Sequence, residues 1–239
     1  LTANAADFTF IFVGDLDINT MRGLVEQYIA SLPSDPANST AERPLRDNPA
    51  LDIKPGTSTH IETMNMKSPQ TYAFVMQWAD IPFSMRNSQL ASIAGQILSS
   101  RLIDTVREKE GAVYSIWATG SLDRIGTQNA SLMTQFPMKP QMRDKVLGII
   151  SEQIAAMSRE VDGAELAKAK EYMTKQYTAA REENGEWIRQ MAGTALDGID
   201  CINGNIESLN AITAADVAAF VKAMTDQGNY RVVILEPEQ

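Results

Sequence analysis

Histidine and cysteine are almost absent from this sequence: His60 and Cys201 are the only ones among 239 residues. A single cysteine excludes a disulfide within the chain. Protein zinc sites usually take several His or Cys ligands, so we do not expect this chain alone to build one. A nucleophilic cysteine needs a nearby base, usually a histidine, and these two residues are far apart in sequence. We therefore interpret Cys201 as a small buried residue and His60, with Glu62, as part of a solvated strand face.

Long apolar runs and positive charge are also scarce. No segment approaches the roughly 18 uninterrupted apolar residues of a membrane span. The net charge of −9 argues against a nucleic-acid partner. The sequence contains no P-loop, dinucleotide-binding fingerprint or nucleophile elbow. Its first ten residues lack the basic and apolar regions of a signal peptide, and a strand candidate follows at once, so we expect a fragment or a processed product.

Prolines divide the chain. Five of the ten lie between positions 33 and 56, mixed with Ser, Asn and Asp, which indicates an extended linker. Before it, residues 8–13 (FTFIFV) are typical of a buried strand, and an amphipathic helix follows Asp17. The strand at 8–13 is similar to the apolar strand at the end of the chain. If this similarity reflects a repeat, residues 1–32 are the closing strand and helix of a preceding domain. Residues 33–57 would form the proline-rich linker, and residues 58–239 a C-terminal α+β domain.

The larger region alternates strand and helix patterns. Strands are expected at 59–66 and 71–78, paired as an antiparallel hairpin, and at 112–122 and 127–136, joined by a second hairpin. A final strand is expected at 230–235. Helices are expected at 86–109, 141–158, 162–181 and 186–199, with another after Thr213. This order predicts an α+β fold whose mixed, mainly antiparallel sheet carries helices mostly on one face.

Arg107 and Tyr114 lie on either side of Gly111, which is placed to end the long helix in a left-handed conformation. If the chain folds back at this glycine, a guanidinium and a phenol could both reach one peptide carbonyl. The spacing alone leaves a plainer interpretation open, in which Arg107 favours the helix C-terminus and Tyr114 packs inside.

Three segments resemble a known family. SSRLIDTVREKEGAVYSI is similar to a segment in the non-catalytic half of pitrilysin/insulinase-type zinc metallopeptidases. FIFVGDLDINTMRGLVEQYIASLP resembles the segment that closes one domain of that family. EENGEWIRQM and ITAADVAAFVKAM…YRVVILEP resemble its last domain in the long, four-domain members. Together these segments cover nearly the whole chain except the proline-rich linker.

The resemblance implies repeated α+β domains in two halves that close around a peptide. Zinc would lie in the first domain on a His-x-x-Glu-His motif, with a glutamate as general base. This sequence lacks that motif, so we expect the segment by itself neither to hold the catalytic zinc nor to cleave peptides. Arg107 and Tyr114 match an Arg and a Tyr, seven residues apart, that contact the substrate backbone and support the scissile carbonyl.

The resulting hypothesis is the substrate-binding C-terminal portion of a zinc endopeptidase. It assigns a substrate-binding role to Arg107 and Tyr114, and no catalytic or metal-binding residue to this segment. The partners would be a peptide substrate and the N-terminal catalytic half of the same protein, with zinc on that missing domain. The alternatives are a non-enzymatic scaffold or inactive partner subunit with the same fold, and an unrelated enzyme or binding module. The resemblance to long bacterial members suggests a periplasmic or envelope-associated location, with the cytoplasm as the alternative.

Overall fold

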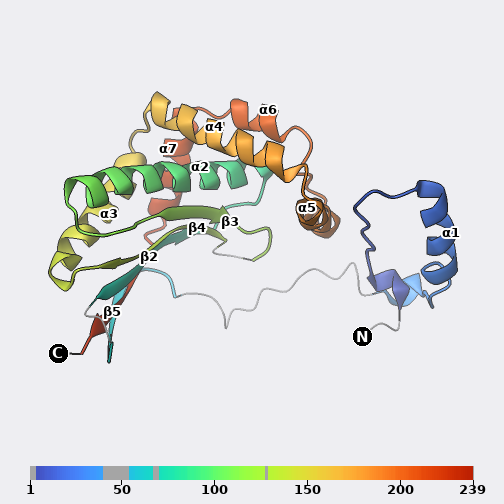
Figure 1. The fold of residues 1–239 in the computed structure, drawn as a ribbon, viewed down its shortest axis with the longest axis horizontal. Coiled ribbons are helices and arrows are strands. Elements are labelled where there is room, and N and C mark those ends of the chain that lie inside the picture. Colours follow the sequence, from blue (N-terminus) through green and yellow to red (C-terminus); the bar gives the residue numbers. More distant parts are fainter. Residues whose placement is uncertain (1–3, 40–53, 67–69, 127–128, 239) are drawn as a thin grey trace. The chain divides into compact units, whose positions relative to one another are not determined.

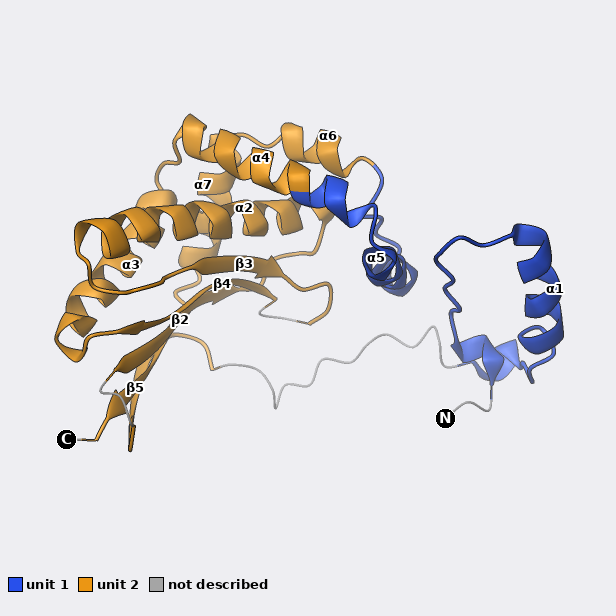
Figure 2. Cartoon of the chain, in the orientation of Figure 1, with its two compact units in different colours: residues 1–46, 176–203 blue, residues 47–175, 204–239 orange. Residues whose placement is uncertain are grey.

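The computed structural model describes residues 4–39, 54–66, 70–126 and 129–238. The chain divides into two compact units, shown in Figure 2. One comprises Leu1–Arg46 and Gln176–Asn203, and the other Asp47–Lys175 and Gly204–Gln239. Much of the expected linker, residues 40–53, falls outside the described part. The three-part domain division expected from the sequence therefore stays a prediction.

The second unit is built on one five-stranded sheet with the strand order β1-β5-β2-β4-β3. Only β1 and β5 run parallel, and the three other pairings are antiparallel. This confirms the mixed, mainly antiparallel sheet. The strands are β1 (Thr57–Met64), β2 (Thr71–Ala79), β3 (Ala118–Leu122), β4 (Ala130–Met138) and β5 (Tyr230–Pro237).

The hairpin expected between the first two strands is wrong. The last strand of the chain, β5, lies between β1 and β2 and pairs with both. Hydrophobicity explains the order, because β5 buries Val232 and Ile234 whereas every residue of β1 is exposed. The more apolar strand takes the inner position, and the polar strand TSTHIETM stands at the sheet edge. The hairpin expected between β3 and β4 is confirmed.

Helices cover one face of this sheet, as the sequence predicts (Figure 1). α2 contacts β3 and β4, α7 contacts β2, and α2, α3 and α7 contact one another. α4 and α6 lie beyond α2, on the side away from the sheet (Figure 1). Among the described helices of this unit, none covers the opposite face. The bounds are α2 (Met85–Leu102), α3 (Arg143–Met157), α4 (Gly163–Ala180), α6 (Asn205–Asn210) and α7 (Ala214–Thr225).

Two helix starts follow the local signals in the sequence. α7 begins at a complete capping box, in which the Thr213 hydroxyl accepts from the Asp216 N–H and the Asp216 carboxylate accepts from the Thr213 N–H. At the start of α4, the Glu165 carboxylate accepts from the Asp162 N–H at 3.2 Å. Asp162 in turn accepts from the Ala164 N–H at 2.7 Å. These caps fix where the two helices begin.

The strand expected at residues 8–13 is not formed in the first unit. This segment belongs to no helix or strand, and Phe8, Phe10 and Phe12 are 43–46% exposed. A strand needs a neighbour for its backbone groups, and residues 4–39 supply none in the described structure. The helix expected after it is confirmed as α1 (Ile18–Tyr28), capped by Asp17, and the same unit contains α5 (Asn184–Asp197).

No helix in the described ranges is long and apolar enough to cross a membrane.

Candidate functional site

Arg107 lies on an unusual turn at the end of the long helix α2. Instead of one α-helix to residue 109, α2 ends at Leu102 and continues as the π-helix η4 (Ile103–Lys109). The Thr105 hydroxyl donates to the Arg101 carbonyl at 2.6 Å, which offers that carbonyl a partner outside the regular helical ladder. π-Helical turns are rare and occur frequently at functional sites. The sequence pattern gave no sign of this wider turn.

The guanidinium of Arg107 is accessible. Its side chain is 51% exposed, and its Nε lies 3.6 Å from the Glu108 carboxylate. An exposed ion pair of this length contributes little binding energy. Arg107 can therefore exchange this neighbour for a carbonyl or carboxylate of a ligand.

Gly111 ends the π-helix in the predicted left-handed conformation, with φ +58°. Its N–H donates to the Arg107 carbonyl at 3.0 Å, and the Ala112 N–H donates to the Val106 carbonyl at 3.2 Å. The first bond is that of an ordinary left-handed C-cap, and the second spans one residue more than its counterpart in a Schellman motif, in keeping with the wider π-turn. They fix the direction in which the chain leaves Arg107 toward Tyr114.

Tyr114 lies in a loop, not in the strand expected from residue 112. β3 begins only at Ala118, and the strand pairing of β3 with β4 extends no further than Thr134. Pro137, further along β4, has no N–H to donate to a neighbour. Within the loop, Ala112 and Ile116 are buried, whereas Tyr114 is 90% exposed. The interpretation that Tyr114 packs inside the domain is therefore wrong.

Tyr114 borders a groove of about 370 Å³ at the end of the sheet where β2 begins and β4 ends. The remaining lining comes from Gln70, residues 111–113 and residues 137–139. Arg107 is not among the lining residues. The groove was not evident from the sequence, because it depends on β4 ending beside a loop that is far from it along the chain.

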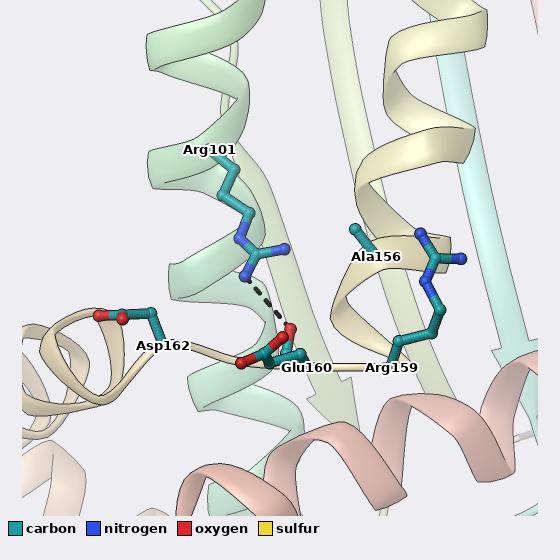
Figure 3. Close-up of a pocket in the computed structure, with 5 residues that line it drawn as sticks. All are labelled: Arg101, Ala156, Arg159, Glu160 and Asp162. Carbon is teal, nitrogen blue, oxygen red and sulfur yellow. Dashed lines mark hydrogen bonds between the residues drawn. The ribbon is translucent and has the colours of Figure 1, made fainter.

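A second pocket holds charged residues but is occupied by internal contacts. It is lined by Arg101, Ala156, Arg159, Glu160 and Asp162 (Figure 3). Arg101 donates to the Glu160 carbonyl at 3.4 Å and makes two 2.7 Å hydrogen bonds to a carboxylate on α4. Its guanidinium joins two helices, so we assign this pocket no ligand.

His60, Glu62 and Cys201 were interpreted from the sequence as structural residues, and the structure agrees with this in part. His60 and Glu62 pair at 2.7 Å on β1 with both side chains well exposed, as expected of a solvated strand face. Cys201 is half-buried, not fully buried as predicted. In the described residues, no three His, Cys, Asp or Glu side chains are grouped to hold a metal ion.

Comparison with known proteins agrees with this architecture. A curated relative from Haemophilus influenzae, named as the probable zinc protease PqqL, is 28% identical over 111 residues, which are 46% of this chain and 11% of the relative. The periplasmic protease PqqL from Escherichia coli superposes with a TM-score of 0.72 at 16% identity, over 95% of this chain and 25% of that one. A peptidase M16 inactive domain from Pseudomonas fluorescens gives a TM-score of 0.72 at 20% identity, over 95% and 53%.

The fold is thus that of domains found in proteins described as M16-type proteases. Residues 3–173 match the profile of the peptidase M16 inactive domain, and the chain belongs to that family. This confirms the resemblance to the non-catalytic half of pitrilysin/insulinase-type zinc metallopeptidases. The chain spans about a tenth of the curated relative and a quarter of the E. coli protease.

Proposed function

We propose that this chain is the C-terminal, non-catalytic portion of a zinc-dependent endopeptidase, and that it binds the peptide substrate opposite a zinc site carried on another domain. The observation that carries the proposal is the exposure of Tyr114 in a member of this family. Tyr114 follows, by seven residues, the accessible Arg107 on the π-turn. A tyrosine that served only the fold would be expected to bury more of its ring.

The two side chains supply complementary donors. The Arg107 guanidinium offers several N–H donors and a permanent positive charge, and the Tyr114 hydroxyl offers one donor. Aimed at a peptide carbonyl, they stabilise the negative charge that develops on its oxygen during hydrolysis. Zinc, on the other domain, would supply activation of the attacking water. The proposal assigns no metal ligand to this chain, whose part is to bind and position the peptide.

The proposal includes the rest of the protein as partner. Phe8, Phe10 and Phe12 are exposed in the described segment 4–39, which supports residues 1–32 being the end of a preceding domain that covers them. Residues 58–239 would then close against the N-terminal catalytic half around the substrate. The description of E. coli PqqL as periplasmic supports a periplasmic or envelope-associated location.

The test uses the full-length protein with Arg107→Ala and Tyr114→Phe. We expect kcat/KM for peptide cleavage to fall by about 10²-fold for Arg107→Ala, and by about tenfold or more for Tyr114→Phe, by analogy with removal of one oxyanion donor. Bound zinc and the unfolding temperature should remain those of the parent protein.

Matched controls are available on the helical layer. Arg159→Ala removes an exposed arginine from the pocket of Figure 3, and Tyr172→Phe removes the hydroxyl of an exposed tyrosine on α4. Neither should change turnover. If the Arg107 and Tyr114 variants behave like these controls, the substrate-binding role is wrong. A full-length protein that binds zinc but cleaves no peptide would favour the scaffold alternative.

A further inference from the structure

The groove beside Tyr114 has an apolar floor. Ala112, Val113 and Met138 line it and are at most 8% exposed, and Pro137 adds a half-buried ring. Such a floor gains free energy by removing apolar ligand surface from water, at about 25 cal/mol per Å². The volume of about 370 Å³ is at the lower end of the range of small-ligand sites. It suits a single amino-acid side chain with its neighbours.

The exposed rim of the groove carries hydrogen-bond donors. The Gln70 Oε1 accepts from the Tyr72 hydroxyl at 3.3 Å, which leaves its Nε2 hydrogens to a ligand. Within the described ranges, the Lys139 ammonium makes no ion pair or hydrogen bond. The Tyr114 hydroxyl completes the rim. An ammonium and an amide suit a carboxylate or a carbonyl, and the charge-assisted hydrogen bond from the ammonium is the stronger of the two interactions.

The charge near the groove differs from that of the whole chain. The chain has a net charge of −9, yet no acidic residue is among the described residues that line the groove. Glu110, immediately before Gly111, is engaged by Lys145, and Glu108 lies beside Arg107. Among the described residues that line the groove, Lys139 is thus the one charged side chain, and it lies beside an apolar floor.

We propose that this groove is a specificity subsite that takes an apolar substrate side chain whose neighbouring group is a carboxylate. The apolar side chain lies against Val113 and Met138, and Lys139 binds the carboxylate. The carboxylate comes either from an adjacent Asp or Glu side chain or from the C-terminus of the peptide. The inference rests on the proposed function, because it assigns part of the substrate preference to the site marked by Tyr114.

The test compares peptides cleaved by the full-length protein. All carry one leucine and blocked termini, and the residue after the leucine is Glu or Gln. We expect kcat/KM to favour Glu by about three- to tenfold. A second pair with a free or amidated C-terminal leucine distinguishes the α-carboxylate from the side chain as the source. Replacing leucine by serine in each of these peptides should lower kcat/KM with the parent protein, because serine loses the apolar contact with the floor of the groove.

The protein variants test Lys139 directly. Lys139→Met should abolish the preference for the carboxylate, and Lys139→Glu should invert it. The control Lys168→Glu, an exposed charge reversal on α4, should leave the preference unchanged. A ratio that is the same in all four proteins would overturn the subsite, as would equal cleavage of the leucine and serine peptides.

A binding measurement separates the two proposals. In the 239-residue chain, the Glu peptide should shift the NMR amide signals of residues 111–114 and of Lys139, and Lys139→Glu should remove these shifts. Loss of turnover in the Arg107 and Tyr114 variants, without a change of preference in the Lys139 variants, leaves the proposed function standing and removes the subsite. If the signals shift at the groove but the Arg107 and Tyr114 variants are fully active, the subsite stands and the role proposed for Arg107 and Tyr114 is removed.

Discussion

Gly95 on α2 and Gly120 on β3 meet backbone to backbone. A Cβ atom on Gly95 would lie 2.1 Å from the Gly120 nitrogen, and a Cβ on Gly120 would lie 1.8 Å from the Ala91 carbonyl oxygen. Real Cβ atoms do not approach other atoms so closely, so any side chain at either position must separate helix from strand. This contact packs α2, which continues into the π-turn, directly on β3, the strand that follows the Tyr114 loop.

Gly120→Ala should therefore destabilise the domain strongly. We expect the free energy of unfolding to fall by about 2–4 kcal/mol, because backbone cannot move aside as a flexible side chain can. Urea unfolding of the 239-residue chain, followed by circular dichroism, gives the value. Gly148→Ala is the control, since a Cβ there meets open space on α3 and should stabilise by about 0.5–1 kcal/mol. Equal stability of the two variants would contradict the close contact.

The Arg101–Glu165 pair links α2 to α4 and should make stability depend on pH. Hydrogen bonds from Arg101 hold the pKa of Glu165 below its ordinary value of 4.5. As pH falls, the unfolded chain takes up this proton before the folded protein does. The stabilisation is therefore complete above pH 4.5 and is lost as pH falls through the lowered folded pKa.

Glu165→Gln should lower the free energy of unfolding by about 1 kcal/mol at pH 7, since the pair is only partly shielded from water. Below the folded pKa the parent protein and the variant should converge. Urea midpoints measured between pH 3 and 7 test both statements. Glu171→Gln, which removes a carboxylate from an exposed pair with Lys175, should give no measurable change at any pH. A constant gap between the parent and Glu165→Gln down to pH 3 would argue against the assigned pair.

The effects of Arg107→Ala and Tyr114→Phe should not be additive in the full-length protein. If both groups hold the same stretch of substrate, removal of one loosens the contact of the other. The double variant should then lose less than the product of the two single losses in kcat/KM. Steady-state kinetics on one peptide give the four values of the cycle. Strictly multiplicative losses would indicate that the two residues act on separate parts of the substrate.

Much of the fold follows from periodicity and caps. The helix patterns identify α2, α3, α4, α5 and α7, because each carries a regular apolar face or a capping signal. Strand pairing is less accessible from sequence, since it depends on which strands are buried most. The hydrophobic β5, last in the chain, displaces the polar β1 from the side of β2. The strand pattern at residues 8–13 misled because the described segment 4–39 contains no strand to pair with it.

The candidate site was only partly accessible from the sequence. The sequence identified Gly111, Arg107 and Tyr114, because a glycine at a helix end and a family motif both mark this segment. The π-turn was not, since it depends on how the buried Val106 and the Thr105 hydroxyl settle at the helix end. The groove with Lys139 was missed as well, because no local pattern connects residues 111–114 to the end of β4.

Gly111 offers a test of whether the turn geometry itself matters for activity. With φ +58° and no atom within 4 Å of an added Cβ, Gly111→Ala should cost only the strain of a left-handed alanine, about 1 kcal/mol. Gly198→Ala, at the C-cap of α5 with φ +76° and equally open space, should cost the same. Gly111→Asn should cost less than alanine, because asparagine tolerates this conformation better.

In the full-length protein, only the Gly111 variants should lower kcat/KM, because only this turn sets the placement of Tyr114 relative to Arg107. Alanine should lower it more than asparagine. Equal activity of Gly111→Ala and Gly198→Ala would mean that the fold-back serves the domain and not the substrate.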